Sequence, residues 1–320
     1  MKKIIPFLCF CVVSVFCLAV SAQDEKNTKY TLKVQYPAGK YQNVIDSDMD
    51  MTIGMSGQTA KMPMKQKQTQ YMTLDVTPKT EDGTQTLTME TTRIATEVKS
   101  PFANMKFDSA DPDAANGPMK AAGVAVGLKA VMTCKDGKII KVEGIEEFFE
   151  KLAANPDYPK QTAEMLKKQF NNESLTKNFD IQQKAMPSSQ PVAVGEQWKT
   201  DGTAEIPMLG KVKTVLNNTL KEVKEENGKK IAVIISKTNI KSAEPKELEA
   251  GNGVKTTFTK FSIDTTTTFN LEIESGLVLS SDADIVLEME SKIEAAGKTI
   301  EQQLSGTGKS TVTIAPFPVK

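Results

Sequence analysis

The sequence predicts a mainly β protein, with a long antiparallel curved sheet or open barrel built from two related halves and central helices that form a lid. Three observations predict this class. Apolar and polar residues alternate over long stretches, which is the period of a strand. Turn pairs such as Asp136-Gly137 and Asn227-Gly228 separate these stretches. A helical period of 3.6 residues occurs in one region, between Gly144 and Phe179.

The clearest predicted strand covers residues 45–55. One of its faces is apolar and the other is mostly acidic, as expected for a strand between a core and water. The apolar face holds Ile45, Met49, Met51, Ile53 and Met55, and the polar face holds Asp46, Asp48, Asp50 and Thr52. Residues 30–36 are expected as a strand before it, and residues 62–76 and 84–98 as strands after it. Residues 101–118, rich in Pro, Asp, Asn and Gly, are expected as a loop.

The helical stretch divides the chain. Ile145, Phe148, Phe149 and Leu152 have the spacing of one helix face, and Met165 and Phe170 belong to a second such pattern. We therefore expect a first β-rich half at 23–142, a helical insertion at 143–186 and a second β-rich half at 187–320, with the halves in one domain. The alternative is that the insertion merely links two domains.

The second half repeats the turn pattern of the first. A Gly-x-x-Trp opening at Gly195 corresponds to the Gly-x-Tyr opening at Gly39, and later Asn-Gly and Ser-Gly turns follow in the same order. This predicts an internal duplication. An ordinary antiparallel meander would also show glycine turns at such intervals. The expected strands include 212–223, 230–240, a short one at 269–273 and one or two within 299–314.

The N-terminus has the pattern of a signal peptide. Lys2 and Lys3 precede an apolar run, and the run ends at Val20-Ser21-Ala22, a small-residue cleavage site. We expect residues 1–22 to be removed and the protein to be exported to the periplasm, the cell surface or the medium. An uncleaved anchor is the alternative. After cleavage, no apolar run is long enough for a transmembrane segment.

The sequence lacks the residues that several kinds of catalytic and binding site require. The chain has no histidine, which removes Ser-His-Asp, Cys-His and HExxH catalysis. Cleavage would leave Cys134 as a lone thiol, expected to be buried and inert. Arg93 is the only arginine, so nucleic acid and phosphorylated ligands are not expected partners. We expect no catalytic residue, no metal and no cofactor.

The remaining signal is an apolar surface. Methionines on two neighbouring strands and the aromatic face of the helices could together line a ligand cavity or fill a solid core. The candidate lining residues are Met49, Met51, Met55, Met62, Met64, Phe148, Phe149, Leu152, Met165 and Phe170. Two other interpretations are weaker. Copper(I) at the methionines would usually draw on His or Cys, and calcium at Asp46, Asp48 and Asp50 would need a Gly bend and a terminal Glu.

The Gly-x-x-aromatic openings, the Thr- and Lys-rich strands, the Asp-Gly and Asn-Gly hairpins and the central helices resemble an uncharacterised family of secreted Bacteroidetes-type bacterial proteins. The long strands with inserted helices also look like the half-open barrels of bacterial lipoprotein carriers. The resemblance implies an exported β-rich protein and carries over no site residues. The sequence favours a non-enzymatic envelope protein that binds a lipid or other hydrophobic molecule. An envelope scaffold that binds another envelope protein is the alternative, and a carboxylate-based hydrolase is the third.

Overall fold

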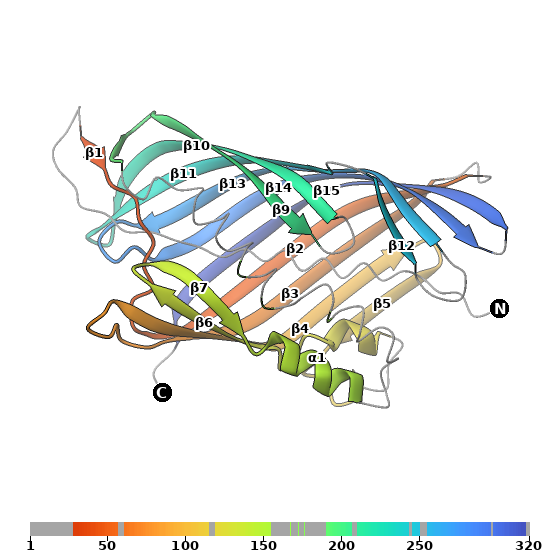
Figure 1. Ribbon diagram of the computed structural model, residues 1–320, viewed down its shortest axis with the longest axis horizontal. Helices are drawn as coiled ribbons and strands as arrows, with labels where there is room; N and C mark the ends of the chain where they lie inside the picture. Colours follow the sequence, from red (N-terminus) through yellow and green to blue (C-terminus); the bar gives the residue numbers. More distant parts are fainter. Residues whose placement is uncertain are drawn as a thin grey trace.

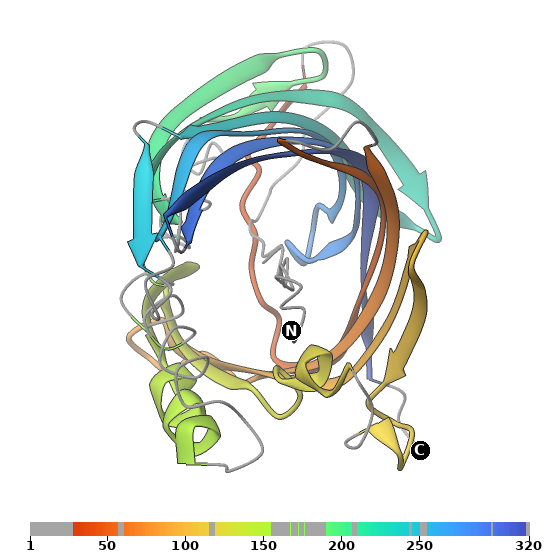
Figure 2. The ribbon, with the colours of Figure 1, turned by 90° about the vertical axis from the view of Figure 1, so that its right-hand side faces the viewer.

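The fold is known from a computed structural model of the 320-residue chain. It describes residues 28–56, 61–114, 119–154, 190–206, 210–242, 245–249, 255–295 and 297–317, with the single positions 167, 172 and 176. A 13-stranded sheet, antiparallel throughout, curves around an interior (Figures 1 and 2). Among the described residues no ladder joins its two edge strands, so the sheet is not closed into a barrel. The predicted fold class is confirmed.

The first half of the chain forms one side of the sheet as an antiparallel meander. Its elements are β2 (Gly39–Met55), β3 (Met62–Val76), β4 (Thr84–Ser100), β5 (Ala103–Asp108), β6 (Lys129–Lys135), β7 (Lys138–Glu143) and the helix α1 (Ile145–Ala154). β5 and β6 both pair with β4, and β7 is the edge strand. A short 3₁₀ helix at Lys120–Gly123 precedes β6.

The second half forms the other side in the same manner. Its strands in the main sheet are β9 (Gln197–Ile206), β10 (Gly210–Glu226), β11 (Lys229–Ser242), β12 (Lys246–Glu249), β13 (Lys255–Glu272), β14 (Val278–Ala295) and β15 (Lys298–Pro316). β12 pairs with β13, and β9 is the edge strand. The short strands β1 (Lys29–Tyr30) and β8 (Val192–Ala193) form a separate ladder.

The two halves meet where the last strand pairs with the first long one. β15 and β2 are paired from Tyr41↔Pro316 to Met55↔Gln302 without a register shift. Near the middle of this seam the hydroxyls of Ser47 and Ser310 lie 3.2 Å apart. The sheet is therefore continuous across both halves.

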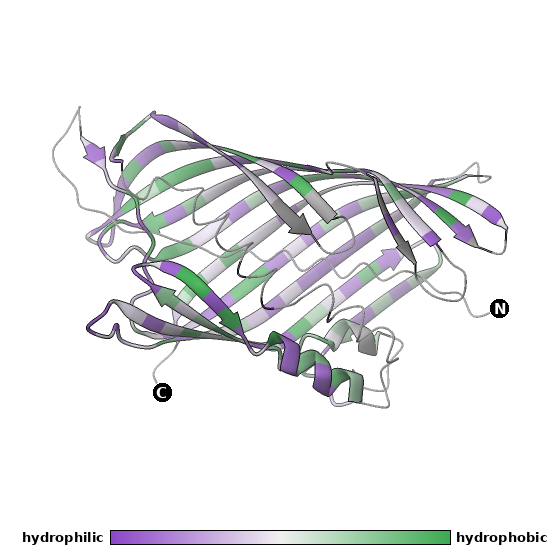
Figure 3. Cartoon of the chain, in the orientation of Figure 1, coloured by the Kyte–Doolittle hydropathy of each residue, from purple (hydrophilic) through white to green (hydrophobic). Residues whose placement is uncertain are grey.

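The faces of β2 are those predicted. Ile45 is buried and the methionines are partly buried, whereas Asp46, Asp48 and Asp50 are exposed. Asp50 pairs with Lys65 at 2.7 Å and Asp48 with Lys67 at 2.6 Å, each pair lying directly across β2 and β3. Hydropathy alternates along the strands in the same way over much of the sheet (Figure 3). The acidic face is thus a solvated, ion-paired surface.

The predicted strand at residues 30–36 is not part of the main sheet. Leu32, Val34 and Tyr36 are buried and Lys33 is exposed, so the alternation is correct. However, residues 31–38 run across one end of the curved sheet (Figures 1 and 2). We call residues 28–38 the strap. The strap hydrogen-bonds to both sides, through Gln35 N to Gly276 O at 3.0 Å and Gln85 Nε2 to Tyr36 O at 2.9 Å.

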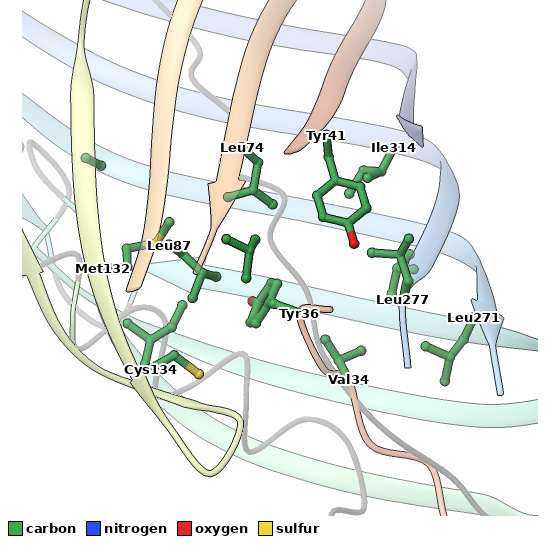
Figure 4. Packing of buried hydrophobic residues seen from close by; sticks show 14 of the residues in the cluster. Val34, Tyr36, Tyr41, Leu74, Leu87, Met132, Cys134, Leu271, Leu277 and Ile314 are labelled. Atoms are coloured by element: carbon green, nitrogen blue, oxygen red, sulfur yellow. The ribbon is translucent and has the colours of Figure 1, made fainter. Parts of the chain in front are cut away.

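The largest core cluster lies at this strapped end. It combines the strap with apolar side chains from both halves of the sheet (Figure 4), and α1 adds further side chains to it. Leu74 and Leu87 come from the first half, and Leu271 and Ile314 from the second. Because one cluster contains residues from both sides, its burial holds the two arms of the sheet together.

The helical stretch is described only at its start. α1 packs with Ile145, Phe149 and Leu152 in the core cluster of the strapped end, beside β6. The second predicted helical pattern falls within residues 155–189, which lie outside the described residues apart from three single positions, so the lid stays a prediction. No helix in the described part of the chain is both long and apolar enough to span a membrane.

Two sequence-based expectations were wrong in detail. The predicted loop at 101–118 contains β5, which returns along β4 after a tight turn at Pro101-Phe102. Its short alternation of Met105 and Phe107 against Lys106 was masked by the surrounding turn-forming residues. The predicted short strand at 269–273 is the end of β13, which begins at Lys255 and contains a bulge near Thr259.

Candidate functional site

The concave face of the sheet is the candidate site, because its described side chains carry no charge. Inward-facing residues of β2 are the odd-numbered ones from Tyr41 to Met55, and their partners in register continue the same face across β3, β4 and β9 to β15. Every described side chain at these positions is uncharged. Lys246 of β12 pairs with Phe258 and is therefore also placed on this face, in the row of Met55. The convex face carries the ion pairs, such as Lys260–Glu288 at 2.9 Å and Lys309–Asp284 at 3.5 Å.

A transverse band of polar side chains crosses the middle of the concave face. Its members pair directly from strand to strand, and we call them the polar row. They are Thr96, Gln68, Ser47, Ser310, Ala283, Thr267, Ser236, Asn218 and Trp198. Ala283 is apolar and Trp198 offers only its indole N–H, whereas the other seven present hydroxyl or amide groups. The band can therefore donate and accept hydrogen bonds without a formal charge.

Two apolar rows lie beyond the polar row, away from the strap. The first contains Met64, Met51, Gly306, Leu287, Ile263 and Ile240, in register across six strands. The second contains Met62, Ile53, Leu304, Met289 and Phe261. Most of these side chains belong to one buried cluster, in which Leu287 is 2% exposed. The described members of that cluster all come from the sheet.

Glycines at the seam make room for the methionines. Gly306 faces Met51 and Gly308 faces Met49 across β15 and β2. A Cβ added to Gly308 would lie 2.6 Å from the backbone oxygen of Asp48 and closer still to Met49 Sδ. A Cβ on Gly306 would lie 2.9 Å from Met51 Cγ. The methionine side chains thus lie over the glycines, and the two strands approach closely there.

Three buried polar atoms on this face have no hydrogen-bond partner among the described residues. They are Asn43 Oδ1, Thr96 Oγ1 and Thr214 Oγ1, in side chains that are 3%, 4% and 6% exposed. Asn43 and Thr96 belong to the first half of the sheet and Thr214 to the second. Buried polar groups are nearly always satisfied, and leaving one unpaired costs about 1–3 kcal/mol. These atoms are therefore available to a bound molecule or to water.

The structure separates the predicted lining residues into groups. Met49 and Met51 pack against the cluster of the apolar rows, and Met64 packs against a third cluster that contains Val98 and Phe107. Met55 and Met62 lie at the far ends of β2 and β3. The helix residues Phe148, Phe149 and Leu152 pack instead at the strapped end. Met165 and Phe170 lie outside the described residues.

Several residues of this face were not singled out from the sequence. The polar row, Thr214 and the second-half apolar residues belong to the site only because β15 pairs with β2. The alternation of Ile285, Leu287 and Met289 against Asp284, Glu288 and Glu290 was the available signal. This alternation indicates which residues face inward, but it does not indicate which strand pairs with this one.

Other candidate chemistry finds no support in the described residues. No group of three His, Cys, Asp or Glu side chains there could hold a metal ion. Cys134 is fully buried, as expected, and burial raises its pKa to about 11, which keeps it protonated at neutral pH. A hollow of about 410 Å³ opens on the convex face, between Lys241, Lys260, Asp264 and Glu288. Its charges balance and its wall is solvated, which does not favour an apolar ligand.

The single arginine is engaged on the convex face. Arg93 Nε donates to Asp108 Oδ1 at 2.8 Å, a second bond joins Nη2 to Oδ2, and the guanidinium lies 5.1 Å from the centre of the Tyr71 ring. This pair fastens β5 to β4. Two of its donors thus hold a carboxylate of the same chain in a bidentate pair.

The Asp108 carboxyl is expected to titrate with a pKa of about 2, below its ordinary 3.8, because Arg93 and then the Ala110 amide donate to it. A lowered carboxyl pKa means that the pair stabilises the fold above about pH 4 and that this contribution is lost as the pH falls towards 2. Carboxyl chemical shifts followed by NMR would check the value. Arg93→Lys should raise the pKa, and an ordinary pKa in the wild type would contradict the expectation.

Comparisons with solved structures return weak likenesses. A structure of lipid–protein interactions in lipovitellin matches 89% of this chain with 8% identity and a TM-score of 0.44. OccK7 of Pseudomonas aeruginosa matches 87% of this chain and 100% of its own, with 5% identity and a TM-score of 0.24. The NalP translocator domain of Neisseria meningitidis matches 86% and 89%, with 8% identity and a TM-score of 0.18. This chain spans 26% of the lipovitellin chain.

Comparison with curated proteins returns no match. A family model does match, over residues 82–278, and its description is a family of unknown function, DUF6263. The matched region covers most of the sheet, from the β3–β4 turn to the start of β14, and more than half of the 320 residues. The chain belongs to the DUF6263 family.

Proposed function

We propose that this protein is an exported, non-enzymatic carrier or receptor that holds an apolar molecule, such as a lipid, against the concave face of its sheet. The observation that carries the proposal is that the described side chains of that face are uncharged and form two apolar rows. Export rests on the N-terminal signal pattern in the sequence.

The distribution of charge supports a concave face that binds a ligand rather than one that only packs against a second layer of the protein. A sheet with only a structural role would bury one apolar face against a second layer. Here the described members of the apolar cluster come from six strands of one sheet, and α1 packs elsewhere. A curved sheet with an uncharged, partly apolar lining is chemically suited to binding a lipid.

Native mass spectrometry of the gently purified protein tests the proposal. We expect an apolar small molecule to accompany the wild type. Ala283→Phe, which adds bulk in the middle of the concave face, should abolish its binding. Val286→Phe is the matched control, because Val286 lies three residues further along β14 on the convex face and is 47% exposed.

Urea unfolding of both variants would show whether Ala283→Phe still folds. A wild type that carries no apolar molecule and takes up no lipid from detergent-free mixtures would overturn the proposal. Cross-linking to a single envelope protein in that case would favour the scaffold alternative. Retention of the molecule by a folded Ala283→Phe variant would place its site elsewhere.

A further inference from the structure

We infer that the bound molecule is an electrically neutral amphiphile, such as an acylglycerol, rather than a fatty acid or an anionic phospholipid. The inference rests on the function proposed above and specifies its ligand class. It follows from which groups the concave face offers and which it lacks.

The first step is the missing counter-ion. The polar row and the two apolar rows hold no Lys or Arg that could pair with a carboxylate or phosphate. Lys246, which β12 places on the concave face opposite Phe258, lies in the row of Met55, eight residues along β2 from Ser47. Arg93 is bonded to Asp108 on the convex face, and Lys65 and Lys67 are paired with Asp50 and Asp48 there. An ionised headgroup on the concave face would be desolvated without a partner, which is strongly unfavourable. A cationic headgroup would likewise meet no acid.

The second step is the set of neutral hydrogen-bonding groups. The polar row presents hydroxyls and amides across the sheet, and the Ser47 and Ser310 hydroxyls lie 3.2 Å apart at its centre. Thr96 Oγ1, at one end of this row, has no partner among the described residues, although the side chain is more than nine-tenths buried. Thr214 Oγ1 is likewise unpartnered, but Thr214 pairs with Ile240 and so lies in the register of the first apolar row. A threonine hydroxyl both donates and accepts, so it suits the hydroxyl and ester oxygens of a neutral headgroup.

The third step is the spacing between polar and apolar groups. The apolar rows begin four residues beyond Ser47 along β2, at Met51, and continue to Ile53. At about 3.3 Å per residue, the stretch from Ser47 to Ile53 is about 20 Å long. One leaflet of a bilayer has a hydrocarbon depth of about 15 Å. An acyl chain therefore fits along the strands while its headgroup lies at the polar row.

A binding comparison at pH 8 tests the inference. Monoolein and oleate share one acyl chain, and at this pH oleate is ionised while monoolein is neutral. The chain has a single tryptophan, Trp198, at the end of the polar row, so its fluorescence can report binding to the delipidated protein. We expect monoolein to bind with a Kd at least tenfold lower than that of oleate.

Isosteric variants locate the headgroup. Thr96→Val and Thr214→Val each remove a hydroxyl and keep the shape of the side chain. We expect Thr96→Val to raise the Kd for monoolein at least fivefold. Thr214→Val should leave it unchanged, because Thr214 lies in the register of the first apolar row. Neither change should affect the Kd for an unsubstituted alkane. Thr266→Val is the control, because Thr266 is exposed on the convex face beside the polar row. Urea midpoints would show that all three variants fold.

The outcomes separate the two proposals. Equal affinities for monoolein and oleate, or tighter binding of oleate, would overturn the neutral-ligand inference and leave a lipid-binding function standing. Unchanged monoolein binding in a folded Thr96→Val variant would also overturn it, since that hydroxyl would then serve the fold or water alone. Binding of neither lipid would contradict the proposed function itself.

Discussion

Gly308→Val is expected to lower the free energy of unfolding by about 3 kcal/mol or more. The added Cβ would lie 2.6 Å from the Asp48 backbone oxygen and closer still to Met49 Sδ. The methionine can move, but the backbone oxygen belongs to the paired strand β2. The two strands would have to separate at the seam that joins the halves. Urea unfolding followed by circular dichroism measures the loss.

Two further variants make this expectation specific. Thr307→Val changes the neighbouring residue of β15, which is exposed, and should leave stability within about 0.5 kcal/mol. Gly308→Val combined with Met49→Ala should recover only part of the loss, because the contact with the Asp48 oxygen persists. Full recovery would mean that the close approach of the strands is unimportant, and an unchanged midpoint for Gly308→Val alone would contradict the seam geometry.

Leu32→Ala is expected to destabilise the protein by about 2–5 kcal/mol. Leu32 is fully buried in the core cluster of the strapped end, although it belongs to no strand. Truncating it leaves a cavity between the strap and the residues of both arms. This is a large fraction of the 5–15 kcal/mol that stabilises a typical domain. Thermal and urea unfolding would each detect it.

Lys33→Ala is the matched control, because Lys33 is the exposed neighbour in the same strap. We expect this change to leave the midpoint within the range of ordinary surface substitutions. If the two variants had the same stability, the strap would not be part of the cooperative core. In that case the two arms would have to be held together at the β2–β15 seam and not at the strapped end.

The features that were predicted correctly are those that depend on residues close together in the sequence. The two faces of β2 follow from the alternation of its methionines and aspartates, and the Asp136-Gly137 and Asn227-Gly228 turns adopt the positive φ angles that such pairs favour. Leu32, Val34 and Tyr36 alternate within the predicted strand 30–36, and all three are buried. Each of these features is determined by a few consecutive residues.

Features that depend on distant residues were not predicted. Nothing local indicates that residues 31–38 leave the sheet to cross its end, because an alternating segment has the same pattern in a strap and in a strand. The polar row could not be recognised either, since its nine members are scattered from Ser47 to Ser310 and align only through the registers of eight ladders. The face of the helices was predicted, but not the place where α1 packs.

The seam between β2 and β15 also constrains the order of folding. Ser47 and Ser310 are 263 residues apart, whereas most other neighbours in the sheet are joined by short turns. Local hairpins form early because little chain entropy is lost, but closing so long a loop comes late and gives the topology a high contact order. During synthesis one edge of β2 therefore stays unpaired until β15 leaves the ribosome. β2, in the middle of the sheet, is the first long strand to be synthesised and the last to have both of its edges paired.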